Sequence, residues 1–198
     1  MSILIREVRE HELESVLALN NSAGPGILSL EMDQLRHSFE EAAYFRVAVL
    51  GDTVLGFLIG FDQESRYRSS NYQWFKQRYP EFLYIDRVVI ARAQRRGGLG
   101  RVFYADVTSF AEVRRPLLAC EVFLEPRNDA VLLFHGTYGF QEVGQRVMDE
   151  TGLRVSMLVK ELASYAWVKQ HWLDGPGLPD VPWLAGRPRR AGAQGEGR

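Results

Sequence analysis

Short apolar runs alternate with segments of helical periodicity along the N-terminal half of the chain. The run at residues 3–8 predicts a strand, and the segment after it has apolar residues at the three- and four-residue spacing of an amphipathic helix. Beyond a glycine–proline break, residues 29–42 show the same spacing, with Ser29 in position to cap the helix. Two β-rich runs then flank Gly51-Asp52, which is a hairpin signal. This half therefore predicts a strand, two helices and an antiparallel hairpin.

Residues 63–80 are polar but rich in aromatic side chains, including Tyr72 and Trp74. A segment of this length between strands more often carries function or a short helix than idle coil. Two interpretations stay open. The segment covers an acceptor substrate as a lid, which would favour a substrate with an apolar or planar body, or its large side chains simply pack over the sheet.

The second half repeats the alternation in a different order. The apolar run at residues 82–91 predicts a strand, a glycine-rich stretch follows, and residues 99–114 have helical spacing. Another apolar strand, at 116–124, precedes a helix opened by Asn128-Asp129. Two further β-rich runs then flank a polar turn that ends at Gly152, and they predict an antiparallel pair. A strand–helix–strand order beside hairpins predicts a mixed α/β sheet.

The composition changes near residue 165, where prolines and glycines become frequent and apolar periodicity stops. We therefore expect one domain over residues 1–164 and an extension over 165–198. Residues 165–173 can form a last helical turn or two, and 185–198 are expected to be disordered because so polar a segment cannot bury itself. The tryptophans of the extension could dock on the domain or on a second subunit, so a homodimer is one interpretation; they are Trp167, Trp172 and Trp183.

Composition and charge narrow the function. The 198 residues, 46% hydrophobic, suffice for one substantial core. A net charge of −1 supplies no basic surface for nucleic acid or an anionic membrane. Cys120, the only cysteine, excludes an internal disulfide and a cysteine zinc cage, and its apolar neighbours predict a buried thiol rather than a nucleophile; no metal site is expected. Without a signal peptide or an apolar span, we expect a cytoplasmic protein.

The stretch Gln94–Gly100, QRRGGLG, joins a predicted strand to a predicted helix. Unpaired backbone N–H groups at a helix start form an anion site, and glycines let the backbone approach a phosphate closely. Arg95 and Arg96 can add charge-assisted contacts. A plain tight turn with solvated arginines is the alternative. A P-loop fits poorly, because Gly100 is followed by Arg101 rather than by Lys and Ser or Thr, and the dinucleotide fingerprint needs another glycine spacing.

Arg95-Arg96-Gly97-Gly98-Leu99-Gly100 resembles the Gln/Arg-x-x-Gly-x-Gly/Ala signature of the GNAT superfamily of N-acetyltransferases. The downstream segment EPRNDAVLLFHGTYGFQEVG is similar to that family's asparagine-opened helix, which ends in a Gly-Phe pair. The order of elements also matches from residue 3 to about 162, so the resemblance covers all but the extension. More narrowly, SSNYQWFKQRYPEFLYIDRVVI with CEV and FHGTYGF is similar to a little-characterised bacterial group of GNAT acetyltransferases.

The resemblance implies a mixed, mostly antiparallel sheet of six to seven strands, flanked by helices and splayed between the fourth and fifth strands. It also implies that acetyl-CoA, or a close acyl-CoA, is the co-substrate and that the acyl group passes directly to a primary amine. The resemblance implies that the backbone of three residues contacts the pantetheine and acetyl groups: Val88, Val89 and Ile90. It implies that the phosphates are bound by the amides of Arg95, Arg96, Gly97, Gly98, Leu99, Gly100 and Arg101. The side chain of Asn128 would lie near the pantetheine or the thioester, and it could equally cap its helix.

Acetyl transfer needs a neutral amine, so a base is required. Asp86 and Glu121 are the candidates, since each is a carboxylate within an otherwise apolar strand, where an unused charge is expensive. On neighbouring strands they could face one cleft. Alternatively, Asp86 pairs with Arg87 and Glu121 faces solvent. Tyr84, two residues before Asp86 and so on the same strand face, is a weaker candidate for contact with the substrate.

The departing thiolate needs a proton, which the GNAT family often supplies from a tyrosine five residues before the Phe of the Gly-Phe pair. That position is His135 here, a departure from the family pattern, while Tyr138 lies elsewhere on the helix. His135 could protonate the thiolate or could be a packed residue. The sequence thus predicts an N-acetyltransferase acting on a small-molecule amine, a peptide N-terminus or a lysine. The alternative is a non-catalytic acyl-CoA sensor or interaction module.

Overall fold

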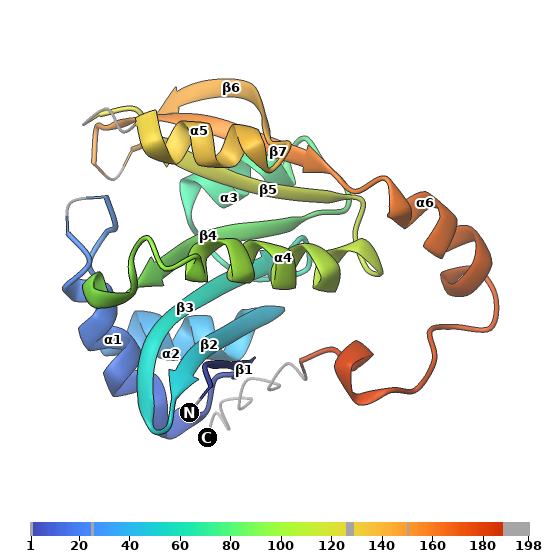
Figure 1. Ribbon diagram of the computed structural model, residues 1–198. Coiled ribbons are helices and arrows are strands. Elements are labelled where there is room, and N and C mark those ends of the chain that lie inside the picture. The colour runs from blue at the N-terminus through green and yellow to red at the C-terminus, as the bar shows by residue number, and fades with distance from the viewer. Residues whose placement is uncertain (1, 25, 126–128, 150, 188–198) are drawn as a thin grey trace, which may run out of the picture.

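Seven strands form one mixed sheet in the order β1-β2-β3-β4-β5-β7-β6 (Figure 1). The computed structural model describes residues 2–24, 26–125, 129–149 and 151–187. The strands are β1 (Leu4–Glu7), β2 (Tyr44–Leu50), β3 (Thr53–Asp62), β4 (Leu83–Ile90), β5 (Leu117–Phe123), β6 (Gln141–Val147) and β7 (Arg154–Glu161). The helices are α1 (Leu13–Asn21), α2 (Met32–Glu41), α3 (Ser70–Lys76), α4 (Leu99–Glu112), α5 (Asp129–Thr137) and α6 (Ser164–Val168).

The helices cover both faces of the sheet (Figure 1). One apolar core lies between the sheet and α1, α2 and α3, with side chains such as Leu35 and Phe75 fully buried. The other lies between the sheet and α4 and α5, around Phe103 and Tyr104. We call these the α2 face and the α4 face. Strand residues alternate between the two because successive side chains point to opposite sides of a sheet.

The predicted hairpins and the mixed sheet are confirmed. β2 and β3 pair antiparallel across the two-residue turn Gly51-Asp52, in which Gly51 takes a φ of 59°. β6 and β7 also pair antiparallel. β4 and β5 are parallel, but they pair only from Leu83 with Leu118 to Ile85 with Cys120. Beyond that point the two strands separate, which is the predicted splay.

A bulge in β4 changes which side of the sheet its residues face. The register against β3 shifts between Ile59, which opposes Arg87, and Gly60, which opposes Ile85. Leu83 and Ile85 therefore face α4 before the bulge, whereas Val88 and Ile90 do so after it. Asp86, the extra residue, consequently shares the α2 face with Arg87.

The start of α2 differs from the prediction. Ser29 does not cap it; the helix begins at Met32 after Glu31, whose side chain accepts from the N3 backbone while Gln34 accepts from the Glu31 amide at 2.8 Å. This reciprocal capping box satisfies two amides at once, so it outcompetes a serine two residues earlier. Segment 63–80 contains α3, and its Tyr72 and Phe75 are fully buried against the sheet.

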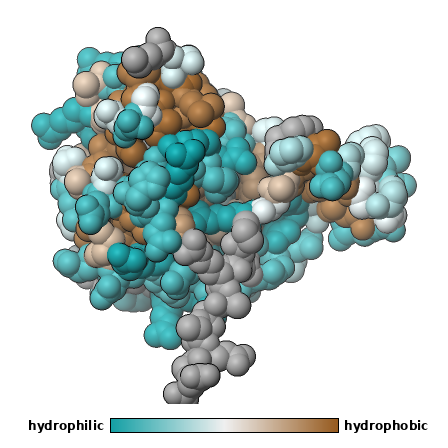
Figure 2. Space-filling model, turned by 90° about the horizontal axis from the view of Figure 1, so that it is seen from below, coloured by the Kyte–Doolittle hydropathy of each residue, from teal (hydrophilic) through white to brown (hydrophobic). Residues whose placement is uncertain are grey.

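The C-terminal extension projects from the sheet and then returns along it (Figure 1). Its predicted helical turns are present as α6 and a π-helical turn, Lys169–Leu173. On the face in Figure 2, hydrophilic side chains predominate, while the projecting extension mixes polar and apolar ones. None of the helices in the described part of the chain has both the length and the apolar character that a membrane-spanning helix needs.

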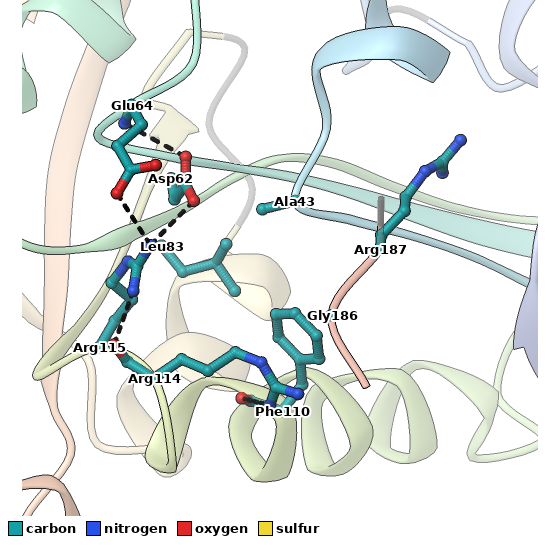
Figure 3. Close-up of a pocket in the computed structure, with 9 residues that line it drawn as sticks. All are labelled: Ala43, Asp62, Glu64, Leu83, Phe110, Arg114, Arg115, Gly186 and Arg187. Atoms are coloured by element: carbon teal, nitrogen blue, oxygen red, sulfur yellow. Dashed lines mark hydrogen bonds and ion pairs between the residues drawn. The ribbon is translucent and has the colours of Figure 1, made fainter. Parts of the chain in front are cut away.

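The end of the described chain, residues 185–187, lies against the domain. Arg187 donates a hydrogen bond of 2.7 Å to the carbonyl of Phe39, and its guanidinium lies 4.4 Å from the centre of that ring. Arg114 donates to the carbonyl of Leu184. Arg114 and Arg187, together with Phe110 and Arg115, line a small cavity of about 230 Å³ (Figure 3). The guanidinium groups of Arg114 and Arg187 thus gain aromatic and carbonyl partners, and these contacts hold the polar segment against the domain.

Candidate functional site

A large pocket opens where β4 and β5 separate. Its volume is about 1160 Å³, ample for a ligand the size of a cofactor arm with a second substrate. Asp86 to Ile90 of β4 and Cys120 to Phe123 of β5 form facing walls. The loop between α1 and α2 closes one side, and α4 and α5 close the other. Because the strands do not pair here, the pocket is lined from both faces of the sheet.

The glycine-rich turn lies at the end of β4 and leads into α4. Among the described residues, no acceptor pairs with the backbone amides of Arg96, Gly98, Leu99, Gly100 or Arg101. Two positive φ angles, 71° at Arg96 and 83° at Gly98, shape this turn. A row of unpaired amides at the N-terminus of a fourteen-residue helix is an anion site, strengthened by the helix dipole.

The arginine side chains of the turn differ in role. Arg95 donates to the carbonyls of Ile90 at 3.1 Å and Ala23 at 3.0 Å, so it ties the α1–α2 loop to the end of β4 and lines the pocket. Arg96 is exposed. The tight backbone leaves little room, since a Cβ at Gly97 would lie 3.3 Å from the Gln94 carbonyl oxygen. Leu99 contributes its amide to the turn while its side chain is buried in the core.

Asp86 is held in an ion pair. Its carboxylate lies 2.5 Å from Arg87 Nε and accepts a hydrogen bond of 2.6 Å from the Tyr67 hydroxyl. Arg87 also donates to Asn20 at 3.0 Å and to the Leu28 carbonyl at 3.2 Å. Both side chains of the pair are more than nine-tenths buried. The pairing with Arg87 that the sequence left open is present, and together with the Tyr67 hydroxyl it occupies the Asp86 carboxylate.

Glu121 faces Asp86 across the splay but has no cationic partner among the described residues. Its carboxylate accepts a hydrogen bond of 2.7 Å from the Tyr84 hydroxyl. Burial and the nearby charge of Asp86 raise the pKa of Glu121 to about 7, although the Tyr84 bond opposes the shift. Glu121 lies on the α2 face, with Ala119 and Phe123 of the same strand. A carboxyl group poised near neutral pH is suited to general base catalysis.

His135 lies across the pocket from Glu121, on the α4 face. Its ring is buried, with Nδ1 2.8 Å from the carbonyl of Val131 and Nε2 2.6 Å from the Tyr104 hydroxyl. A carbonyl only accepts, so Nδ1 carries the hydrogen and Nε2 of the neutral ring accepts from Tyr104. Burial lowers the pKa of His135 and raises that of Tyr104. Both residues line the pocket.

The remaining predicted residues are scattered. Val88, Val89 and Ile90 line the pocket with Asp86, Glu121 and His135. Tyr72 is fully buried behind it, with its hydroxyl 2.7 Å from the Asp62 carbonyl, and Trp74 packs against Gly144 and Arg78; neither lines the pocket. Asn128 lies outside the described residues. Cys120 is a buried free thiol, as predicted, and burial raises its pKa.

Sequence reasoning missed two residues that the fold brings into the pocket: Arg87, which was considered only as a partner of Asp86, and Tyr104. Tyr67 belongs to the aromatic segment predicted either to cover the acceptor or to pack over the sheet; it lines the pocket and stacks on Phe61, with ring centres 4.0 Å apart. Tyr104 has the spacing of a core residue on α4, so no sequence signal separates it from its neighbours. Arg87 was not expected in the pocket, because neighbouring residues of a regular strand face opposite sides of the sheet, and Arg87 would then face away from Asp86.

No family model matches the sequence, and no curated protein matches it. Solved structures do match. The ribosomal-protein-S18-alanine N-acetyltransferase from Escherichia coli matches with a TM-score of 0.63 and 13% identity, over 81% of this chain and 94% of that one. The acetyltransferase of GNAT family from Streptococcus pneumoniae matches with a TM-score of 0.60 and 17% identity, over 81% of this chain and 99% of that one. The chain has the GNAT fold. Arabidopsis thaliana Naa50 in complex with the bisubstrate analogue CoA-Ac-MVNAL matches similarly, with a TM-score of 0.62 and 14% identity over 81% and 99%.

The GNAT fold accounts for the geometry described above. A seven-stranded mixed sheet with β4 parallel to β5, flanked by helices, is the predicted architecture. At these identities the likeness concerns the fold.

Proposed function

We propose that this protein is an acyl-CoA-dependent N-acetyltransferase that passes an acetyl group from acetyl-CoA directly to a primary amine. We assign the activity to residues 1–164. The observation that carries the proposal is one pocket whose lining includes both Glu121, a carboxyl group with a pKa of about 7, and Arg95, which is next in sequence to the turn with the unpaired amides of Arg96 and Gly98 to Arg101. An anion site and a general base at two ends of one splay are what thioester aminolysis by a nucleotide-bearing donor requires.

The residues present fit acetyl-CoA. The amides of the glycine turn can hold its pyrophosphate, and the edges of β4 and β5 offer the unpaired backbone groups of Val88 to Ile90 to the pantetheine amides. The apolar side chains of Val88, Ile90 and Val131 line the way between them. When bound, the co-substrate supplies an acyl thioester; Asn128 stays a further proposed contact.

Glu121 takes the role of general base in this proposal. Its carboxylate accepts a proton from the ammonium form of the acceptor, and the neutral nitrogen can then attack the carbonyl carbon of the thioester. Asp86 contributes its charge, which attracts the cationic amine and helps to raise the pKa of Glu121, but its own lone pairs are engaged by Arg87 and Tyr67. Tyr84 holds the Glu121 carboxylate in place.

The acceptor enters from the α2 side in this proposal. Ile27, Leu28, Leu30, Phe123 and Met148 line that part of the pocket, so an amine attached to an apolar group fits better than a highly charged one. A peptide N-terminus satisfies this description, which agrees with the peptide-bearing analogue bound to Naa50. A small apolar amine satisfies it too. Tyr72 and Trp74 would then support the wall from behind rather than touch the acceptor.

Two measurements test the proposal in sequence. Binding of CoA is followed by thermal unfolding, because a ligand at about a hundred times its Kd stabilises a protein by roughly 2.7 kcal/mol. Release of free CoA from acetyl-CoA is then followed with peptides that have a free N-terminus, side-chain lysine peptides and small apolar amines. We expect stabilisation and turnover with at least one apolar amine. Stabilisation without transfer to any amine would favour an acyl-CoA sensor, and no stabilisation would refute CoA binding.

A further inference from the structure

Tyr104 of α4 and His135 of α5 form an isolated polar pair within the apolar layer between the helices and the sheet. The hydroxyl and Nε2 are 2.6 Å apart, and both side chains are buried among Phe134, Tyr138 and Phe140. Neither side chain of this pair forms a hydrogen bond with the glycine turn or with Glu121 among the described residues. A polar pair inside an apolar cluster is costly to maintain, and both members border the pocket.

We propose that Tyr104 is the group that delivers a proton to the departing CoA thiolate, with His135 as the positioning residue that holds the hydroxyl and restores its proton. The inference rests on the proposed acetyl transfer and deepens it. It also accounts for the histidine at position 135, where the GNAT family often has a tyrosine. The hydroxyl that such a tyrosine would provide comes from Tyr104 of the neighbouring helix α4.

The two faces of the sheet separate the two proton transfers. Glu121, Asp86, Tyr67 and Tyr84 approach the splay from the α2 face. Tyr104 approaches it from the α4 face, beside Cys120. The amine loses its proton on one face and the thiolate gains a proton on the other. No single side chain therefore has to act both as the base and as the acid. The separation also keeps the base from taking up the proton meant for the thiolate.

The hydrogen-bond directions specify how the proton moves. In the neutral pair, Nδ1–H donates to Val131 and the Tyr104 hydroxyl donates to Nε2, so no hydrogen points to the pocket. When His135 takes a proton from solvent, Nε2–H donates to the Tyr104 oxygen and the hydroxyl hydrogen is free to point at sulfur. Because burial makes the imidazolium a stronger acid than usual, it gives up this proton readily.

The step balances. As the C–S bond of the tetrahedral intermediate breaks, its electron pair stays on sulfur, which takes the Tyr104 hydroxyl proton; the Tyr104 oxygen takes the Nε2 proton of His135. The products are a thiol, a neutral phenol and the neutral imidazole described above. The protons lost by the attacking nitrogen leave through Glu121 and solvent. The other titratable groups near the pair are Cys120 and Glu121 on β5 and Tyr138 on α5.

The test compares Tyr104→Phe with Tyr138→Phe in the full-length protein. Tyr138 belongs to the same aromatic cluster but does not line the pocket, so it is a matched loss of one hydroxyl. We expect Tyr104→Phe to slow single-turnover acetyl transfer by about 100-fold, within the range of general acid catalysis, with CoA affinity unchanged. His135→Gln should have a similar effect, and the double variant should be no slower, because the two residues act as one unit. Tyr138→Phe should stay within about twofold.

Two results overturn the inference and leave acetyl transfer standing: a Tyr104→Phe rate within about threefold of an active wild type, or a loss of CoA affinity as large as the loss of rate, which would show a packing role. Wild-type protein that binds CoA but acetylates no amine overturns both proposals. If Tyr104→Phe does not fold, 3-fluorotyrosine at position 104 keeps the ring in place. Its more acidic phenol should speed single-turnover transfer, and an unchanged rate would refute the role.

Discussion

Asp86 and Arg87 are neighbours in the sequence and nevertheless form a buried ion pair, with Asp86 Oδ2 2.5 Å from Arg87 Nε on one face of the sheet. Adjacent strand residues normally point to opposite faces. The register shift between β3 and β4 adds one residue at this point and so turns both side chains toward the α2 face. The bulge thereby places an ion pair at the mouth of the splay, opposite Glu121, which has no cationic partner among the described residues.

Asp86→Asn is expected to destabilise the protein, because it leaves the Arg87 guanidinium buried without its carboxylate. Removing one partner of a buried pair costs about 3–5 kcal/mol, so the midpoint of urea unfolding should fall clearly. The double variant Asp86→Asn, Arg87→Gln should recover part of the loss. Asp52→Asn, in the exposed hairpin turn, serves as the control. A single variant as stable as wild type would contradict the pairing.

Glu121→Gln is expected to lower kcat/KM for the acceptor by about 100-fold or more, in the range of a lost general base. The sign of the pH dependence follows from the raised pKa: the carboxyl must be ionised to accept a proton, so wild-type activity should fall as pH drops below about 7. The variant should lack this acidic limb. Glu161→Gln, on the exposed end of β7, should keep it. An identical profile in Glu121→Gln would exclude Glu121 as the base.

Gly98→Val is expected to abolish CoA binding. The residue has a φ of 83°, which β-branched side chains rarely adopt, so the substitution should reshape the turn that carries the unpaired amides. Isothermal titration with CoA measures the effect. Gly51→Val strains another positive-φ turn, one that does not line the pocket, and should cost stability without changing CoA affinity. Wild-type affinity in Gly98→Val would refute the phosphate assignment.

Arg187→Ala is expected to lower the free energy of unfolding by about 1.5–3 kcal/mol, the range of a charge-assisted hydrogen bond. Its guanidinium is buried to nine-tenths, donates to the Phe39 carbonyl and lies over that ring. Chemical denaturation gives the value. Arg36→Ala, an exposed arginine on α2, is the comparison and should change little. Equal effects would mean that the extension does not brace the domain.

Local patterns were sufficient for the elements themselves. Alternation and turn residues predict the β2–β3 and β6–β7 hairpins, and the glycine turn with its helix follows from Arg95 to Gly100 alone. These features depend on residues close in sequence, whose backbone preferences are set by glycine φ freedom, capping and side-chain alternation. The same reasoning failed at the start of α2, where the Glu31–Gln34 capping box competes with Ser29 at short range.

The sequence by itself determined the strand–turn–helix that can bind an anion and marked Asp86, Glu121 and His135 as unusual residues in apolar surroundings. Only the tertiary structure decided which groups they contact. The bulge that pairs Asp86 with Arg87 depends on the register of β4 against β3, and the meeting of Tyr104 with His135 depends on α4 packing beside α5. Register and helix packing are set by the whole core, across thirty-one residues of chain in the case of Tyr104 and His135, so no local pattern carries them.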